Sequence, residues 1–337
     1  MKNIGYYTTG SVDVLVDIDL PRPTPGPRDL LVEVRAISVN PVDAKIRAGS
    51  GPGGPSGEAK VLGWDAAGVV AAIGTEATRF SPGDEVYYAG ALDRTGSYAE
   101  FHLVDERIVG HKPGRIGFAE AVALPLTTLT AWEMLFNRLT IRVGKPDNAG
   151  YLLVIGGAGG VGSIATQLAR RLTGLTIIST ASRPETQAWS LEMGAHHVID
   201  HRRPIAEQVK AIVPDGVNYV LALTRTEDHF DEIVEALAPQ GALALIENPA
   251  RPLDIVKLKP KSISLHWEFV FTRTHYETAD MGEQGRLLNE VAGLVDAGLI
   301  RTTMNANLGP INAANVRRAH SIAESGTLIG KLVLSGF

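Results

Sequence analysis

The sequence contains no cysteine. This absence excludes disulfide bonds, iron–sulfur clusters, cysteine nucleophiles and zinc sites with thiolate ligands. Basic residues are not in excess, because 32 Lys and Arg stand against 37 Asp and Glu, a net charge of −5. Nucleic acids and anionic membranes attract proteins with a basic excess, so we expect neither as a partner. No apolar run reaches the about 18 residues that a membrane-spanning helix needs, and the N-terminus lacks a signal-peptide pattern, so we expect a cytoplasmic protein.

The 337 residues, 45% of them hydrophobic, are enough for about two globular domains. Glycine is abundant, at 36 residues, and it gathers at 49–57 and 156–162. Clustered glycine indicates tight turns or a close approach of the backbone to a ligand.

The pattern of the chain changes near residue 120. Before it, short β-like runs alternate with turn signals, which predicts a mostly β module. After it, continuously apolar segments alternate with amphipathic ones, as in a parallel sheet covered by helices on both faces. The predicted strands of this part are Tyr151–Ile155, Thr176–Thr180, His197–Ile199, Asn218–Leu223, Ala242–Ile246 and Ile263–Trp267. The predicted helices are Val161–Leu172, Pro184–Met193, Pro204–Ile212 and Phe230–Leu237.

The C-terminal tail is predicted to contain two helices and a strand, at Glu283–Ala297, Asn312–Glu324 and Thr327–Leu334. We expect this strand to return to the first module, which would make that module discontinuous. The predicted domains are therefore 1–125 with 273–337, mostly β, and 126–272, a doubly wound α/β domain.

A glycine-rich turn follows the first strand of the α/β part. Gly157, Gly159 and Gly162 form the pattern G-x-G-x-x-G, with a strand before it and an amphipathic helix after it. Glycines allow the backbone to approach a pyrophosphate, and the helix N-terminus offers it unpaired N–H groups. The sequence therefore predicts a Rossmann-type dinucleotide site. The predicted contacts of this turn are Gly157, Ala158, Gly159, Gly160, Val161 and Gly162.

The end of the second strand favours NADP(H) over NAD(H). An NAD site places an acidic residue there for the ribose hydroxyls, about 20 residues after the turn. This chain has Thr180, Ser182 and Arg183 instead, and an arginine fork suits a 2′-phosphate. His201 and Arg202, after the third strand, are expected to close the same pocket. Leu223, Thr224 and Ile246, at the ends of the fourth and fifth strands, are predicted to border the ribose groups.

Motifs along the whole chain resemble the medium-chain dehydrogenase/reductase superfamily. They are Asn40-Pro41-Val42-Asp43, Leu62–Gly68, Pro82–Val86, Gly96–Glu100, Ala123–Trp132, the glycine turn and Ile329-Gly330-Lys331. The order and number of these motifs resemble the zinc-free quinone oxidoreductase branch, and within it a zinc-type alcohol dehydrogenase-like bacterial subfamily. The resemblance implies a GroES-like catalytic domain for the first module and a homodimer that pairs an apolar edge, for which the sixth strand is expected to continue through Glu268–Phe271.

The resemblance also places metal ligands where this chain has none. Zinc members carry a Cys at the position of Asn40 and a His at that of Trp64. We therefore expect no metal site, and acceptors that are already electrophilic. The predicted function is NADPH-dependent, zinc-independent hydride transfer to quinones or α,β-unsaturated carbonyl compounds. A metal-free ketone or aldehyde reductase and a non-catalytic NADPH-binding protein remain as alternatives.

The predicted catalytic residues are Asn40, Asp43 and Thr127, carried over from the resemblance, and Lys45, which stands where quinone reductases often have a tyrosine. Asn40 would donate a hydrogen bond near the substrate oxygen, Asp43 would orient its neighbours, and Thr127 would lie by the nicotinamide. Lys331 is expected either to bind the cofactor or to be solvated. The donor to the developing oxyanion is open between Lys45, Tyr88 and Trp64. The loop 48–58 is open between a lid and a plain insertion.

Overall fold

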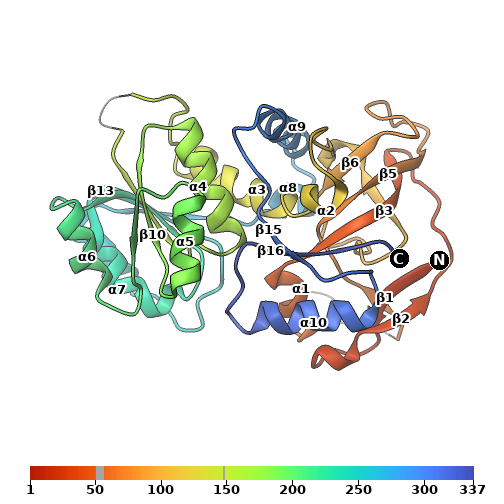
Figure 1. The fold of residues 1–337 in the computed structure, drawn as a ribbon, viewed down its shortest axis with the longest axis horizontal. Coiled ribbons are helices and arrows are strands. Elements are labelled where there is room, and N and C mark those ends of the chain that lie inside the picture. Colours follow the sequence, from red (N-terminus) through yellow and green to blue (C-terminus); the bar gives the residue numbers. More distant parts are fainter. Residues whose placement is uncertain (51–56, 147–148) are drawn as a thin grey trace. The chain divides into compact units, whose positions relative to one another are not determined.

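The computed structural model describes residues 1–50, 57–146 and 149–337. These form two compact units, Met1–Leu129 with Phe271–Phe337, and Thr130–Val270. The predicted fold class is confirmed, because one unit is rich in β-strands and the other is a parallel sheet with helices (Figure 1).

The first unit is built around the long strand β3 (Asp29–Val39). In its larger sheet the strand order is β15-β16-β3-β5-β6-β8, and β7 also pairs with β3. A smaller sheet has the order β2-β1-β4. The strands are β1 (Lys2–Tyr6), β2 (Val16–Asp19), β4 (Lys60–Val61), β5 (Ala66–Ile73), β6 (Glu85–Tyr88), β7 (Phe101–Asp105), β8 (Gly110–His111), β15 (Met304–Asn307) and β16 (Lys331–Ser335). The helices are α1 (Pro41–Arg47), α2 (Phe118–Ala121), α3 (Pro125–Trp132, whose last residues enter the second unit), α8 (Thr272–His275), α9 (Glu283–Asp296) and α10 (Ala313–Glu324).

Strand β16 joins the two ends of this unit. It pairs antiparallel with β3, with Leu332 opposite Val39. The chain turns at Asn40 directly after β3, because Pro41 cannot continue a central ladder but is suited to the first turn of α1. Lys331, at the start of β16, is therefore brought next to Asn40.

The second unit holds a six-stranded parallel sheet in the order β11-β10-β9-β12-β13-β14. Its strands are β9 (Tyr151–Ile155), β10 (Thr176–Thr180), β11 (His197–Ile199), β12 (Val217–Ala222), β13 (Leu237–Leu245) and β14 (Ser264–Trp267). Its helices are α4 (Gly160–Leu172), α5 (Pro184–Glu192), α6 (Ile205–Ile212) and α7 (Thr226–Ala236). The order reverses between β9 and β12, and such a switch point is where open α/β sheets bind ligands.

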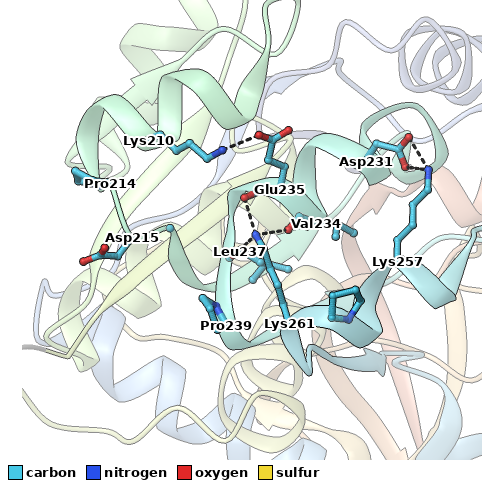
Figure 2. A pocket seen from close by; sticks show the side chains of 12 residues that line it. Lys210, Pro214, Asp215, Asp231, Val234, Glu235, Leu237, Pro239, Lys257 and Lys261 are labelled. Atoms are coloured by element: carbon cyan, nitrogen blue, oxygen red, sulfur yellow. Dashed lines mark hydrogen bonds and ion pairs between the residues drawn. The ribbon is translucent and has the colours of Figure 1, made fainter.

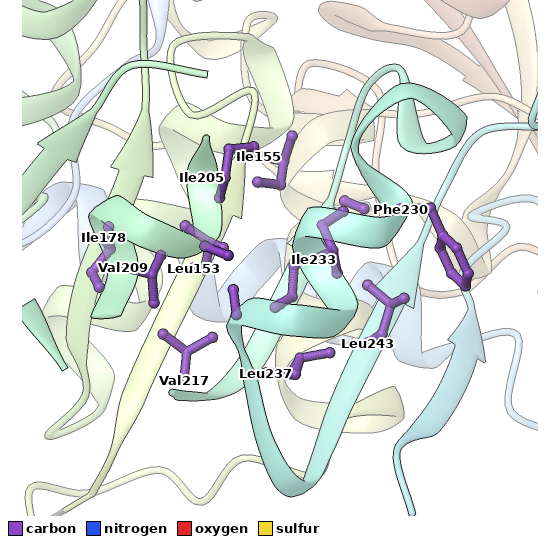
Figure 3. Close-up of a cluster of buried hydrophobic side chains, with 14 of the residues drawn as sticks. Leu153, Ile155, Ile178, Ile205, Val209, Val217, Phe230, Ile233, Leu237 and Leu243 are labelled. Carbon is purple, nitrogen blue, oxygen red and sulfur yellow. The ribbon is translucent and has the colours of Figure 1, made fainter. Parts of the chain in front are cut away.

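Apolar side chains cover the sheet of this unit. Leu153 and Ile155 of β9 belong to one buried apolar cluster with Ile205 and Val209 of α6 and Phe230 of α7 (Figure 3). Continuously apolar strands thus meet the periodic apolar stripes of the helices, as the sequence pattern predicts.

Two predicted elements need correction, and two observed elements were not predicted. Helix α7 begins at Thr226 rather than Phe230, because Glu227 and Asp228 stabilise its first turn through the helix dipole. The sixth strand ends at Trp267 instead of continuing, because Glu268 turns into the interior and pairs with Arg138. A strand at Met304–Asn307 and a π-helical turn at Glu133–Arg138 were not predicted.

The loop 48–58, left open between a lid and a plain insertion, includes residues 51–56, which lie outside the described residues. Within the part of the chain that the structure describes, none of the helices combines the length and the apolar character that crossing a bilayer requires.

Candidate functional site

The glycine turn joins β9 to α4 in the second unit. A Cβ at Gly157 would lie 1.7 Å from Ser179 Oγ, and a Cβ at Gly162 would lie 2.5 Å from the Gly156 carbonyl oxygen. The Thr180 hydroxyl accepts a hydrogen bond from Gly156 N at 3.0 Å, which ties the turn to the end of β10. No side chain caps the N-terminus of α4, so its first N–H groups remain directed outward. These features fit the pyrophosphate of a dinucleotide.

The predicted 2′-phosphate residues lie at the ends of β10 and β11. Arg183 is the N-cap residue directly before α5, and its side chain is 36% exposed. Its guanidinium lies 3.3 Å from the carboxylate of Glu185, an ion pair that the sequence analysis did not anticipate. Arg202 donates to the Ser182 carbonyl at 2.7 Å and also binds the carboxylate of Asp200.

His201 completes this group at the end of β11. Its ring lies 6.1 Å from that of His229 on α7. Burial lowers the pKa of both histidines. The charges of Arg202 and Arg225 lower that of His201 further, and His201 lowers that of His229. A bound anion would favour the protonated form of either ring.

The remaining predicted cofactor residues follow the next strands of the same sheet. Thr224 lies after β12, where a Cβ on Gly156 would contact its methyl group at 2.8 Å. Leu223 N donates to the Ile155 carbonyl, and Ile246 follows β13 directly. The structure therefore brings these residues and the glycine turn to one edge of the sheet, the carboxyl edge.

A cavity of about 770 Å³ lies at the opposite, amino edge of this sheet (Figure 2). Lys210 pairs with Glu235 and Lys257 pairs with Asp231 across it. Lys261 donates to three carbonyl oxygens at the end of α7. These lysines are thus engaged with groups of the protein itself, and the cavity is separate from the predicted cofactor residues.

In the first unit, Asn40 belongs to a buried ionic network. Its Nδ2 donates to Asp65 Oδ2 at 2.8 Å, and its Oδ1 accepts from the Lys331 ammonium. Lys331 Nζ also donates to Asp65 Oδ2 at 3.0 Å and to the Val39 carbonyl at 3.2 Å. Asp65 Oδ1 accepts from Leu126 N, at the start of α3, at 2.8 Å. Lys331 is therefore not solvated. Burial raises the pKa of Asp65, and the nearby charge of Lys331 opposes that rise.

Asp43 lies in a second buried network beside the first. Its Oδ2 accepts from Asn40 N at 2.6 Å and from the Tyr98 hydroxyl at 2.9 Å. The Tyr98 oxygen also lies 3.2 Å from Nε2 of His320. Burial raises the pKa of Asp43 to about 7 and lowers that of His320 to about 3. No role was predicted for Asp65, Tyr98 or His320, although Asp65 stands out in the sequence as an acid in an apolar run.

Three other predicted residues of this unit, Thr127, Trp64 and Tyr88, have partners outside these two networks. Thr127 is buried, and its hydroxyl donates to the Leu124 carbonyl at 3.1 Å. Lys45 is exposed on α1. The Trp64 indole donates to the Ala91 carbonyl, and the Tyr88 hydroxyl lies 2.9 Å from His102 Nδ1. Trp64 and Tyr88 are therefore committed to neighbours within the protein.

Potential metal ligands are scattered. Among residues 1–50, 57–146 and 149–337, no three His, Asp or Glu side chains are grouped so that they could hold a metal ion. At Asn40 and Asp65, the charge that balances the carboxylate is the Lys331 ammonium.

Comparison with known proteins identifies the family. Residues 26–133 match the alcohol dehydrogenase GroES-like domain and residues 160–284 match the zinc-binding dehydrogenases. A zinc-type alcohol dehydrogenase-like protein of Staphylococcus aureus is 41% identical over 315 residues, which are 93% of this chain and 92% of that protein. The chain belongs to the medium-chain dehydrogenase/reductase superfamily. The resemblance stated from the motifs is thereby confirmed.

Other members of this superfamily carry different activities in their names. A quinone oxidoreductase of Pseudomonas aeruginosa is 33% identical and covers 99% of both chains. A 2-methylene-furan-3-one reductase of Solanum lycopersicum is 30% identical over 99% of this chain and 79% of its own.

Two solved structures of the superfamily resemble the fold closely. An alcohol dehydrogenase protein from Rhizobium etli, whose name calls it zinc-dependent, has a TM-score of 0.95 and 52% identity and covers 100% of this chain and 98% of its own. The quinone oxidoreductase of Escherichia coli in complex with NADPH has a TM-score of 0.86 and 27% identity, covering 99% and 100%. The chain is thus a medium-chain oxidoreductase similar to quinone oxidoreductases.

Proposed function

We propose that this medium-chain reductase transfers hydride from NADPH to quinones or α,β-unsaturated carbonyl compounds without a catalytic metal. The observation that carries the proposal is the buried network around Asn40, in which an ammonium balances Asp65. An amide, a carboxylate bound by its neighbours and an ammonium with three acceptors form a poor site for a divalent metal. The acceptor must then be electrophilic without Lewis-acid activation.

The proposed reaction needs little from the protein beyond position and electrostatics. The reduced nicotinamide, when bound, supplies a hydride, and water supplies the proton that completes a hydroquinone or a saturated carbonyl compound. Negative charge develops on the acceptor oxygen as the hydride arrives. We assign to the Asn40 amide the donation of a hydrogen bond to that oxygen, and to Asp43 the support of Asn40 through its backbone N–H.

The cofactor preference rests on the end of β10. Arg183 offers a positive charge to a 2′-phosphate, and a bound phosphate would favour the protonated form of His201. The NADPH bound in the Escherichia coli relative favours the same cofactor here. Glu185 competes for the Arg183 guanidinium, so we expect a preference for NADPH that still allows the use of NADH. We therefore propose NADPH as the preferred cofactor, with slower use of NADH.

Ketone or aldehyde reduction is the second candidate. The names of two relatives favour it, since the Staphylococcus aureus protein is called alcohol dehydrogenase-like and the Rhizobium etli protein an alcohol dehydrogenase. The two candidates differ in the product from an enone, which is a saturated ketone in the first case and an allylic alcohol in the second.

We further propose a homodimer that pairs the β14 edge of two chains. Trp267 is 49% exposed and Phe269 is 46% exposed beside this edge. An open strand edge with exposed aromatics is unfavourable unless another chain covers it. Light scattering should give the mass of two chains for the wild type and of one chain for Trp267→Glu. A monomeric wild type would contradict the dimer.

The test of the function is a panel of acceptors. NADPH oxidation is followed with a quinone, an enone, an enal and a saturated ketone, and NADH runs in parallel. We expect turnover of the quinone or the enone, faster with NADPH. Turnover of the saturated ketone alone would favour the alcohol dehydrogenase, and NADPH binding without any turnover would indicate a non-catalytic protein.

A further inference from the structure

Lys331 reaches Asn40 from the last strand of the chain, 291 residues away. Both side chains are buried, at 2% and 1% exposure. We propose that Lys331 is a positioning residue that fixes the orientation of the Asn40 amide. It would act through Asn40 and would not itself contact the cofactor or the acceptor. This inference rests on the proposed function.

The chemistry of the neighbours selects one of the two amide orientations. The Lys331 ammonium can only donate, so it must face Oδ1 of Asn40. The Asp65 carboxylate accepts, so it must face Nδ2, which lies 2.8 Å from Oδ2. A flipped amide would place a donor against the ammonium and an acceptor against the carboxylate. One N–H of Asn40 is used on Asp65, and the orientation also fixes the direction of its second N–H, the one assigned to the acceptor oxygen.

The same ion pair connects three segments of the first unit. Lys331 Nζ donates to the Val39 carbonyl at the end of β3, and Asp65 Oδ1 holds Leu126 N at the start of α3. Burial strengthens these interactions because water does not compete for them. Asn40 is thus held between elements that cannot shift independently.

The donors of Lys331 are fully used. An ammonium has three N–H groups, and Val39, Asn40 and Asp65 provide an acceptor for each. A lysine that bound a cofactor phosphate would have to leave this network. We therefore expect loss of Lys331 to slow the reaction without weakening cofactor binding.

The test compares Lys331→Met with Lys261→Met. Lys261 is a matched control, because its ammonium also donates to three protein acceptors, but in the second unit, at the end of α7 (Figure 2). For Lys331→Met we expect kcat to fall by about tenfold or more, with the NADPH dissociation constant unchanged. For Lys261→Met we expect kcat to stay at the wild-type value. A raised dissociation constant with unchanged kcat would make Lys331 a cofactor ligand and overturn the proposal, as would a variant with wild-type values for both.

Lys331→Met leaves Asp65 buried without its cation and is at risk of misfolding. The double variant Asp65→Asn with Lys331→Met removes both charges and keeps the test decisive. An amide at position 65 can pair with Asn40 in either orientation, so we expect a folded protein with low kcat. Wild-type kcat in the folded double variant would refute the proposal.

A readout without turnover separates this inference from the proposed function. With ¹⁵N-asparagine labelling, the side-chain amide resonances of Asn40 are assigned by their loss in Asn40→Asp. We expect them to shift in the folded double variant and to stay in place in Lys261→Met. If the wild type reduces none of the acceptors, the function fails, and this resonance alone decides the role of Lys331. Unshifted resonances in the double variant would refute it.

Discussion

Glu268 and Glu133 form a buried pair of acids that share one cation. Their side chains are 0% and 1% exposed, and Arg138 Nε lies 2.8 Å from Glu268 Oε2, while its NH2 group lies 3.8 Å from Glu133 Oε2. One guanidinium cannot balance two carboxylates, so the pair retains a proton. Burial, with the Glu133 charge, raises the pKa of Glu268 from 4.5 to about 8.

The sign of the resulting pH dependence follows from linkage. The unfolded chain loses this proton near pH 4.5, whereas the folded protein keeps it to about pH 8. Between these values the folded state binds more protons, so stability is greatest below the lower value and falls as the pH rises. At about 1.36 kcal/mol per pH unit, the loss amounts to at most about 5 kcal/mol.

Replacing Glu268 with Gln mimics the protonated acid at every pH. We expect Glu268→Gln to match the wild type near pH 5 and to exceed its melting temperature near pH 8.5 by about 5–10 °C. The assay is thermal unfolding followed across this pH range. Glu235→Gln is the control, because Glu235 is exposed and paired with Lys210, and it should keep the alkaline loss of stability. If Glu268→Gln loses stability in parallel with the wild type, the shared proton does not exist.

Other predictions concern the glycine turn, Arg183 and Asp43. A Cβ at Gly157 would collide with Ser179 Oγ of β10, so Gly157→Ala must displace that side chain or the turn. NADPH affinity, measured by fluorescence titration, should then fall by about tenfold. Gly293→Ala, where a Cβ meets nothing within 4 Å, is the unaffected control. Arg183→Ala should reduce the NADPH over NADH ratio of kcat/KM by about tenfold, since a charge-assisted bond contributes about 1.5–3 kcal/mol; an unchanged ratio would remove Arg183 from the pocket. The unfolded chain loses the Asp43 proton near pH 3.8, whereas the folded protein keeps it to about pH 7, so stability falls as the pH rises between these values. Asp43→Asn should abolish this loss of stability, measured by thermal unfolding at about pH 5 and pH 8. An equal loss in the variant would mean that Asp43 does not titrate there.

Much of the second unit could be predicted because its signals are local. Continuous apolar strands and the glycine pattern lie within short windows of sequence, and β9, β10 and β11 have the predicted bounds. The start of α7 was missed because acidic residues in its first turn carry no apolar periodicity. The segment after Trp267 looks like a strand by composition, and only the buried contact of Glu268 with Arg138 explains why the strand ends.

The networks of the first unit depend on contacts that no window of sequence contains. Asp65 and Lys331 are 266 residues apart, and His320 lies 222 residues from Tyr98. Asn40 was predicted from a resemblance, but its two partners could not be. A lysine near the end of a chain is ordinarily solvated, and here the pairing of β16 with β3 buries it.

The most direct test of the proposed function is the kcat/KM for NADPH-dependent quinone reduction before and after exhaustive metal removal by chelation, with metal content measured in both samples. We predict that kcat/KM is the same before and after chelation. We also predict that the active sample holds less than about one metal ion per ten chains, as for adventitious binding. Loss of activity when the metal is removed, restored by adding zinc, would contradict a metal-free site in which the Lys331 ammonium balances Asp65.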